Sequence, residues 1–307
     1  PDADYEKGDE KPWHDVHARV TGPAAADIET NFRQRWNDRH SDPAEKVAAH
    51  PAPAPIVGGP HIVQTLRTFP QNATAAFSLV PWHYDFAPNG EFGLRKAYLK
   101  AIGNARDFIY IEDQYMISAE VSSAIAAAMK RSTHLVVILT TAPAPDSPKK
   151  FINDAFDFHQ TAFINQLLAV DKSRVGLYDL ANVANPRTAI YCHAKICVID
   201  DIWAIIGSCN MSQRSFTNDA EISIAILDET IEHNRRKFAR DLRIALWKEH
   251  LGLTPAEVPL IDDAVIGAAE WSKRAGKPPA HAREHHRPAG SESSLWNSEI
   301  DPLGPHD

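Results

Sequence analysis

The stretch at residues 190–221 reads IYCHAKICVIDDIWAIIGSCNMSQRSFTNDAE and places hydrogen-bonding side chains between strongly apolar strand patterns. It holds a histidine, a lysine and an aspartate at the spacing H-x-K-x-x-x-x-D, then a glycine, a serine and an asparagine: His193, Lys195, Asp200, Gly207, Ser208 and Asn210. Side chains two apart in a strand share a face, so His193 and Lys195 are expected to project together. The apolar residues that alternate with them should face a core: Ala194, Ile196 and Val198.

These polar groups suit a phosphoryl ligand. Lys195 supplies positive charge, and Ser208 and Asn210 can donate hydrogen bonds to non-bridging oxygens. His193 can attack as a nucleophile or give a proton to a leaving oxygen, because an imidazole exchanges its proton near neutral pH. Glu221 can hold the other ring nitrogen and so fix the tautomer.

Each of these residues, taken alone, is more often structural than functional. A strand histidine or lysine is usually packed or solvated, and a Gly-Ser-x-Asn tetrapeptide is most often a turn. Asp200 belongs to the catalytic set by its place in the motif, but it ends a strand. It therefore suits a bond to backbone or to a basic side chain better than proton transfer. The joint spacing, framed by apolar strands, is what favours an active site.

The bulk composition is that of an ordinary globular protein, with 307 residues, 44% hydrophobic and 23% charged. A net charge of −8 argues against a general nucleic-acid binder, which carries a basic surplus. The absence of a long apolar run and of a signal peptide predicts a soluble or peripheral membrane protein and leaves the compartment open. The three cysteines are expected to be buried free thiols rather than disulfides or zinc ligands: Cys192, Cys197 and Cys209.

Alternating helix and strand patterns predict an α/β fold with a mixed sheet flanked by helices. Strands are expected at 16–20, 61–69, 108–113, 134–140, 174–179, on both sides of the Asp200-Asp201 turn, and at 221–227. Helices are expected after Pro23 and at 93–106, 119–131, 151–170 and 230–250. The first helix should bury Ile28, Phe32 and Trp36 on one face, and the last should carry an apolar stripe: Phe238, Leu242, Ala245 and Leu246.

The segment HAKICVID at 193–200, with IIGSCN after it, resembles the HKD motif of the phospholipase D superfamily. Residues 12–36 are similar to the family segment that follows its first HKD motif. FIYIEDQYMI at 108–117 resembles an I-Y-I-E-N-Q element, with Asp113 in place of Asn, and LRIALWKEHLG at 242–252 resembles the closing helix. The resemblance covers residues 12–252 and favours phospholipases D over the nuclease and cardiolipin-synthase branches.

The resemblance implies the phospholipase D fold and a metal-free reaction between two facing HKD motifs. One histidine forms a phosphohistidine and the other protonates the leaving alcohol. Water or another alcohol then releases phosphatidic acid or a transphosphatidylation product. The implied substrate is a phosphatidylcholine-type phospholipid at a membrane surface. No nucleic acid and no cofactor are expected, and calcium dependence is left open.

Carried onto this chain, His193 matches the second-motif histidine and is expected to be the general acid/base. Lys195, Ser208 and Asn210 match phosphate-binding groups, and Glu221 matches the acidic partner of a histidine.

These 307 residues contain a single H-x-K-x-x-x-x-D, and HDVH at 14–17 is not a second one. HDVH is expected to pack or hydrogen-bond at a lobe boundary. The first motif is expected upstream of Pro1, removed by truncation or processing, or else in a second copy of the chain. The isolated chain is therefore expected to have little or no activity.

The resemblance and the composition together divide the chain into four parts. Residues 1–45 are predicted to be the end of an N-terminal catalytic lobe, and the Pro/Ala/Gly-rich residues 46–60 a linker. Residues 61–253 should form a complete C-terminal catalytic lobe. Residues 254–307 should be a partly disordered tail with solvated histidines: His281, His285 and His286.

Other residues carry weaker signals. The QTLRTF strand resembles a family segment near the active site, the end of FIYIEDQ can reach the pocket edge, and the loop aromatics can form a lipid-facing rim. Packing or solvation explains each of them about as well. These residues are Gln64, Arg67, Glu112, Gln114, Trp82, His83, Tyr84 and Arg214, the last as a ligand for an acidic side chain or a phosphate.

Two other functions stay open. One is a phosphatidyltransferase or nuclease-type phosphodiesterase of the same superfamily. The other is a non-catalytic half that binds phosphate or lipid, against which the intact pair His193 and Lys195 argues. A basic groove would favour nucleic acid, and a broad apolar rim would favour lipid.

Overall fold

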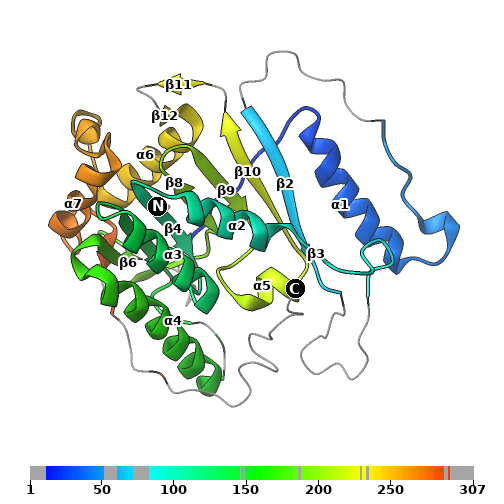
Figure 1. The fold of residues 1–307 in the computed structure, drawn as a ribbon, viewed down its shortest axis with the longest axis horizontal. Helices are drawn as coiled ribbons and strands as arrows, with labels where there is room; N and C mark the ends of the chain where they lie inside the picture. Colours follow the sequence, from blue (N-terminus) through cyan, green and yellow to red (C-terminus); the bar gives the residue numbers. More distant parts are fainter. Residues whose placement is uncertain are drawn as a thin grey trace.

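The computed structural model describes residues 12–51, 61–71, 83–145, 147, 149–185, 188–228, 230–232, 235–286 and 290. Within these residues, 11 strands form one mixed sheet in the order β1-β7-β6-β5-β4-β8-β9-β10-β2-β3, with β13 paired to β6 (Figure 1). Their bounds are β1 Trp13–His14, β2 His61–Phe69, β3 Glu91–Phe92, β4 Phe108–Asp113, β5 Val136–Thr141, β6 Val175–Ala181, β7 Ala189–Cys192, β8 Ile196–Ile199, β9 Trp203–Gly207, β10 Glu221–Asp228 and β13 Ala282–Glu284. β11 (Ile231–Glu232) and β12 (Arg235–Arg236) form a separate hairpin.

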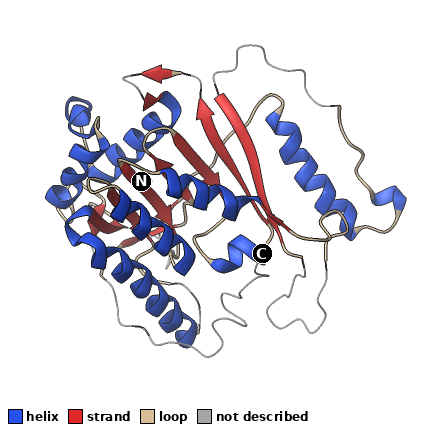
Figure 2. Ribbon diagram, in the orientation of Figure 1, coloured by secondary structure: helices blue, strands red, loops and turns tan. Residues whose placement is uncertain are grey.

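Helices cover both faces of the sheet (Figure 2). One face carries α2 (Gly93–Asn104), α3 (Ala119–Arg131) and α4 (Lys150–Asp171), and the other carries α6 (Lys237–Leu251) and α7 (Ala264–Arg274). The remaining helices are α1 (Ala24–Arg39), α5 (Gln213–Thr217) and the short 3₁₀ turns η2 (Pro43–Glu45), η3 (Lys172–Arg174) and η4 (Pro255–Ile261). The predicted α/β class, a mixed sheet flanked by helices, is confirmed.

The central strands are apolar at successive positions because helices cover both faces of the sheet. In β4, Ile109 and Ile111 pack into the core under α2, α3 and α4, whereas Phe108 and Tyr110 pack into the core under α6 and α7. Successive side chains of a strand point to opposite faces, so a strand buried on both sides must be apolar at every position. The predicted burial of the apolar residues around the motif is confirmed: Ala194, Ile196 and Val198.

The strand connections divide the sheet into two kinds of pairing. β4, β5 and β6 run parallel and are joined through α3 and α4. β8, β9 and β10 are antiparallel neighbours, and the tight turn between β8 and β9 is made by Asp200 and Asp201. Ile199 pairs with Trp203, so the connection holds Asp200, Asp201 and Ile202, and the Ile202 N–H donates to the Ile199 carbonyl across the turn. Both aspartates have positive φ, 54° and 53°, a region that aspartate tolerates better than most residues.

The N-terminal part differs from the sequence-based expectation. The strand expected at 16–20 is instead the two-residue β1, which pairs in parallel with β7 at the sheet edge. α1 lies beside β2 (Figure 1), and its expected core face is wrong, because Phe32 is 56% exposed and Trp36 40%. The predicted linker lies partly outside the described residues, and the division into two lobes stays a prediction.

The C-terminal part is more ordered than expected. η4, α7 and β13 follow α6, and β13 adds an antiparallel strand to β6. His285 is buried and hydrogen-bonds to Asp179 and Gln160, and His281 contacts the Ala181 carbonyl, so the predicted solvation of these two histidines is wrong. His286 is exposed, as predicted. In α6 the buried face is centred on Arg243, Trp247 and His250, and the expected stripe residue Ala245 is exposed.

The three cysteines are buried and free, as predicted. None of the helices in the described part of the chain combines the length and apolar character that crossing a membrane requires.

Gly207 ends β9 and pairs with Ser223 of β10. A Cβ at this position would lie 2.1 Å from the Ser223 Oγ and 2.4 Å from its Cα, and the backbone atom cannot rotate away. We expect Gly207→Ala to lower the free energy of unfolding by at least about 1–3 kcal/mol in urea denaturation. The control is Gly103→Ala, in α2 with no neighbour within 4 Å, which should stabilise by about 0.5–1 kcal/mol. Equal effects of the two substitutions would contradict the prediction.

Candidate functional site

The motif residues gather where several strands begin or end at one edge of the sheet. β7 leads into His193, β8 starts directly after Lys195, and β9 runs out into Ser208. β10 begins with Glu221, and Gln114 directly follows β4. His193 and Lys195 lie in the connection between β7 and β8, not within one continuous strand as expected.

His193 is held by the N-terminal segment of the chain. Its Nδ1 lies 2.8 Å from the Asp15 Oδ2, and its backbone N–H donates to the His14 carbonyl at 2.8 Å. The Trp13 ring lies 4.8 Å from the imidazole, centroid to centroid. The imidazole keeps about a third of its surface exposed, at 34%. The carboxylate that orients His193 is therefore Asp15, and the expectation that Glu221 does so is wrong.

Lys195 is the buried cation of the site, with 6% of its surface exposed. Its Nζ donates to the His193 carbonyl oxygen and, at 3.3 Å, to the Gln114 Oε1. Gln114 is fixed in turn by donating to the Tyr191 hydroxyl at 2.7 Å. Burial lowers the pKa of Lys195, and the carboxylates of Asp113 and Asp15 oppose that shift. Its ammonium is thus positioned by neutral acceptors, as an electrostatic ligand for an anion requires.

Ser208 and Glu221 form a second group across the strand ends. The Ser208 hydroxyl donates to the Glu221 Oε2, and the Ser215 hydroxyl donates to its Oε1 at 2.8 Å. Burial raises the pKa of Glu221 to about 7, although both serine hydrogen bonds oppose the shift. Glu221 is therefore an acid that changes charge near neutral pH, and its carboxylate is bound by the two serine hydroxyls.

Asn210 follows Ser208 by two residues and is half-buried. Its Oδ1 is buried and has no hydrogen-bond partner in the structure. An unsatisfied buried polar atom costs free energy, so such an atom near a site indicates a ligand or water. Lys195, Ser208 and Asn210 all lie at this edge of the sheet, and their role in phosphate binding stays a prediction.

Asp200 lies at the opposite end of β8, away from His193. Its carboxylate accepts three backbone hydrogen bonds at 2.8 Å, from the N–H groups of Arg106, Asp107 and Phe108. It thereby fixes the start of β4. This placement contradicts a catalytic role for Asp200 and agrees with the structural interpretation of the motif.

A buried network missed by the sequence analysis supports the His193 segment. Glu112 is fully buried in β4 and contacts His14 Nε2 at 2.7 Å and His250 Nε2 at 3.0 Å, and Tyr110 donates to it at 2.5 Å. Burial tends to raise the pKa of Glu112, but His250 and His14 outweigh it, so the pKa is lowered. Conversely, burial tends to lower the pKa of His14, but Glu112 raises it overall. The network holds β1 against β4 and α6.

The weaker candidates are mostly engaged in structural contacts. Arg67 forms a bidentate pair with Glu91 and also donates to Gln34, and Arg214 binds Asp219, as one of its two interpretations predicts. Tyr84 is buried against Phe69, so it is not part of a lipid-facing rim. His83 is exposed, and Trp82 lies outside the described residues.

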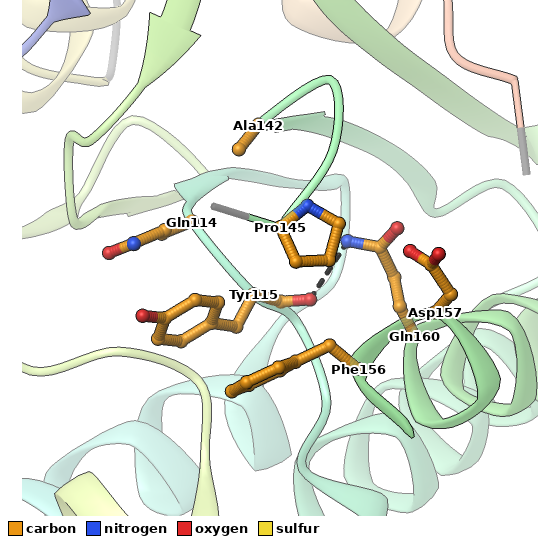
Figure 3. A pocket seen from close by; sticks show the side chains of 7 residues that line it. All are labelled: Gln114, Tyr115, Ala142, Pro145, Phe156, Asp157 and Gln160. Atoms are coloured by element: carbon orange, nitrogen blue, oxygen red, sulfur yellow. Dashed lines mark hydrogen bonds between the residues drawn. The ribbon is translucent and has the colours of Figure 1, made fainter. Parts of the chain in front are cut away.

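Two cavities lie near these elements. The smaller one, about 10 Å³, lies between Gln114, Tyr115 and α4, where the Gln160 amide donates to the Tyr115 carbonyl at 2.9 Å (Figure 3). It holds at most a water molecule. The larger one, about 320 Å³, lies at the Asp200 end of the sheet against Trp203 and Lys100. Neither is lined by His193, so neither is the pocket for a substrate of this site.

The raised pKa of Glu221 predicts a pH-dependent stability. A carboxyl group whose pKa rises from 4.5 unfolded to about 7 folded stabilises the fold while it is protonated. That contribution is complete below pH 4.5 and is lost as the pH rises to about 7. We expect Glu221→Gln to melt at a higher temperature than the wild type at about pH 8, with the difference shrinking towards pH 4.5. A constant difference across this range would contradict the prediction.

Comparison with known sequences gives two family matches. Residues 2–142 match the family described as Phospholipase D, and residues 98–242 match the family described as Cardiolipin synthase, PLD-like domain. The two matches overlap and together run through the His193 site.

Curated relatives are similar at about a quarter identity. Phospholipase D alpha 3 of Arabidopsis thaliana is 27% identical over 335 residues, covering 80% of this chain and 40% of the plant protein. Phospholipase D A of Dictyostelium discoideum is 27% identical over 293 residues, covering 82% of this chain and 22% of that protein. The chain thus spans less than half the length of the curated relatives it matches.

Solved structures are less similar. Phosphatidylserine synthase from Haemophilus influenzae Rd KW20 is 14% identical with a TM-score of 0.43, covering 84% of this chain and 55% of that one. Nuc from Salmonella typhimurium, a phospholipase D family member, is 16% identical with a TM-score of 0.41, covering 61% of this chain and 92% of that one.

Proposed function

The chain belongs to the phospholipase D superfamily, and on that premise we propose that it supplies the His193 half of a site that cleaves glycerophospholipid phosphodiesters. The observation that carries the proposal is the arrangement around His193. A partly exposed imidazole is oriented by Asp15 through Nδ1, with the buried ammonium of Lys195 beside it. That is the base-plus-orienter geometry of acid–base catalysis, combined with a fixed positive charge for a phosphate oxygen.

The proposed reaction has two steps. A second histidine, outside these 307 residues, attacks phosphorus and forms a P–N bond while the P–O bond to the head-group alcohol breaks. His193 gives the proton of its Nε2 to the departing oxygen. In the second step His193 takes a proton from water or an alcohol, which attacks phosphorus and breaks the P–N bond. The histidine–carboxylate contact stabilises the imidazolium form of His193 that precedes the first step and results from the second.

Lys195, Ser208 and Asn210 are proposed to bind the non-bridging oxygens, on which negative charge accumulates. The buried Asn210 Oδ1 without a partner supports this role, because a side-chain amide with an unfilled position can turn either end to a ligand or to a bound water. The preformed contacts of Lys195 mean that little reorganisation is needed when the substrate arrives.

The second histidine is proposed to bind Glu221. Asp15, from the N-terminal segment, already orients His193, whereas the Glu221 carboxylate accepts from the hydroxyls of Ser208 and Ser215. As a carboxylate, Glu221 would accept the Nδ1–H of an arriving neutral imidazole, leave the lone pair on its Nε2 for attack, and stabilise the positive charge that develops on the ring as the P–N bond forms. The isolated chain is accordingly proposed to have little or no activity.

The test compares the longest natural polypeptide that carries these residues with the 307-residue chain. Both are assayed on phosphatidylcholine in mixed micelles for choline release, and for phosphatidyl transfer to added 1-butanol. The proposal expects both products from the longer polypeptide and neither from the 307 residues at submicromolar concentration. Choline release by monomers of the short chain would refute the half-site, and release of neither product by the longer polypeptide would refute the substrate class.

A phosphatidyltransferase is the second candidate. The match of residues 98–242 to the family described as Cardiolipin synthase, PLD-like domain favours it. In a transferase the oxygen of a lipid alcohol attacks the phosphohistidine, takes the phosphatidyl group and breaks the P–N bond. The two candidates differ in which acceptor is used. A large excess of transfer over hydrolysis with glycerol- or serine-type alcohols, at equal protein concentration, would select the transferase.

A further inference from the structure

Two histidines and a glutamate converge at the seam between β1 and α6, away from the groups proposed to contact phosphate. One nitrogen of His14, one nitrogen of His250 and a carboxylate oxygen of Glu249 all lie within 4.8 Å of one another. His14 and His250 are buried, whereas the Glu249 side chain is 62% exposed. The cluster is therefore anchored on two sides and open to solvent on the third.

The contacts of Glu112 determine which nitrogens are available. The Tyr110 hydroxyl donates to the Glu112 Oε1, so the carboxyl group is the hydrogen-bond acceptor at the centre of this network. Both histidines contact it through Nε2, at 2.7 Å for His14 and 3.0 Å for His250, so both must carry the proton on Nε2. In a neutral imidazole the lone pair is then on Nδ1. His14 Nδ1 lies 3.9 Å from the Glu249 Oε1.

From this geometry we propose that His14, His250 and Glu249 bind a divalent cation of the zinc class, through the two Nδ1 atoms and one carboxylate oxygen. Imidazole and carboxylate ligands suit zinc, and three protein ligands leave a fourth position for water. Histidines that bind metals almost always donate their other ring N–H to a carboxylate, a backbone carbonyl or water, and Glu112 fills that role for both rings.

The site has a structural consequence for the segment that carries Asp15. The His14 carbonyl accepts the backbone N–H of His193, and the next residue, Asp15, orients the His193 ring. An ion bound by His14 and by two residues of α6 would therefore hold β1 in the position that places Asp15 against His193. The metal is assigned no part in the reaction, and its binding does not depend on the proposed function.

The test is a zinc titration of the tag-free 307-residue chain by calorimetry at about pH 8, where protons compete least for imidazole nitrogen. The wild type is expected to bind one Zn²⁺ per chain. Loss of one ligand in Glu249→Gln should weaken binding at least about tenfold. The matched control is Glu45→Gln, an exposed glutamate of η2, which should bind as the wild type does. No binding by the wild type, or equal binding by Glu249→Gln, overturns the site.

Replacing either histidine removes a buried contact of Glu112 and can prevent folding, so the histidines are tested without substitution. In ¹⁵N spectra of the wild type, His14 and His250 should appear as Nε2–H tautomers without metal. On adding zinc, their Nδ1 resonances should shift and those of His83 should not. Shifts confined to other histidines, or Nδ1–H tautomers before zinc is added, overturn the assignment.

Discussion

Arg243→Met is expected to lower the free energy of unfolding by about 3–5 kcal/mol. Arg243 is fully buried in α6 and pairs with Asp201 through two bonds of 2.8 Å, from Nε and from Nη2. It also donates to the carbonyls of Ile261 (2.7 Å) and Asp262 (2.9 Å), and so joins the β8–β9 turn to η4. Methionine keeps helix propensity and much of the volume but leaves a buried carboxylate and two carbonyls unpaired.

The measurement is urea unfolding followed by circular dichroism, with two comparisons. Asp154→Ala removes the half-buried partner of the exposed Lys150 and should change stability by no more than about 1 kcal/mol. The double variant Arg243→Met/Asp201→Asn removes the uncompensated charge and should recover part of the loss. A cost below 1 kcal/mol for Arg243→Met would show that the buried pair contributes little to folding.

The elements that could be predicted from sequence are those with strong internal periodicity. β4 and α3 have the predicted bounds, because their apolar patterns and, in α3, the capping Ser118 are local signals. β1 could not be predicted, since two residues carry no period and its pairing depends on β7. The same applies to β13, which is held at β6 together with the buried contact of His285 with Asp179.

The site divides in the same way. The motif residues lie within one stretch, so their meeting at the strand ends followed from spacing. Asp15 is 178 residues from His193, and no pattern in the sequence joins the two. The sequence around Glu112 indicates only a strand end. Its buried contacts with His14 and His250 join residues 98 and 138 positions away, and no local pattern predicts them. Long-range polar contacts are fixed by the packing of the whole sheet, which a single sequence does not specify locally.

Asp15→Asn should lower turnover by about 10²–10⁴-fold in the polypeptide that carries both histidines. The asparagine keeps the size of the side chain but removes the negative charge that stabilises His193 as an imidazolium. It also allows the amide to donate to Nδ1 and so to fix the wrong tautomer. Because Asp15 is half exposed and away from the core, folding should be unaffected.

The measurement is choline release as a function of substrate concentration, with melting temperatures beside it and His193→Asn as the reference for complete loss. The matched control is Asp85→Asn, which alters an exposed aspartate 3.5 Å from His83 and should leave turnover unchanged. A merely structural role for Asp15 would lower the melting temperature and leave kcat of the folded enzyme at the wild-type value. A charge that orients and stabilises His193 during the reaction must instead lower kcat, with KM and the melting temperature little changed. An Asp15→Asn enzyme whose kcat equals that of the wild type would therefore refute the role assigned to this contact.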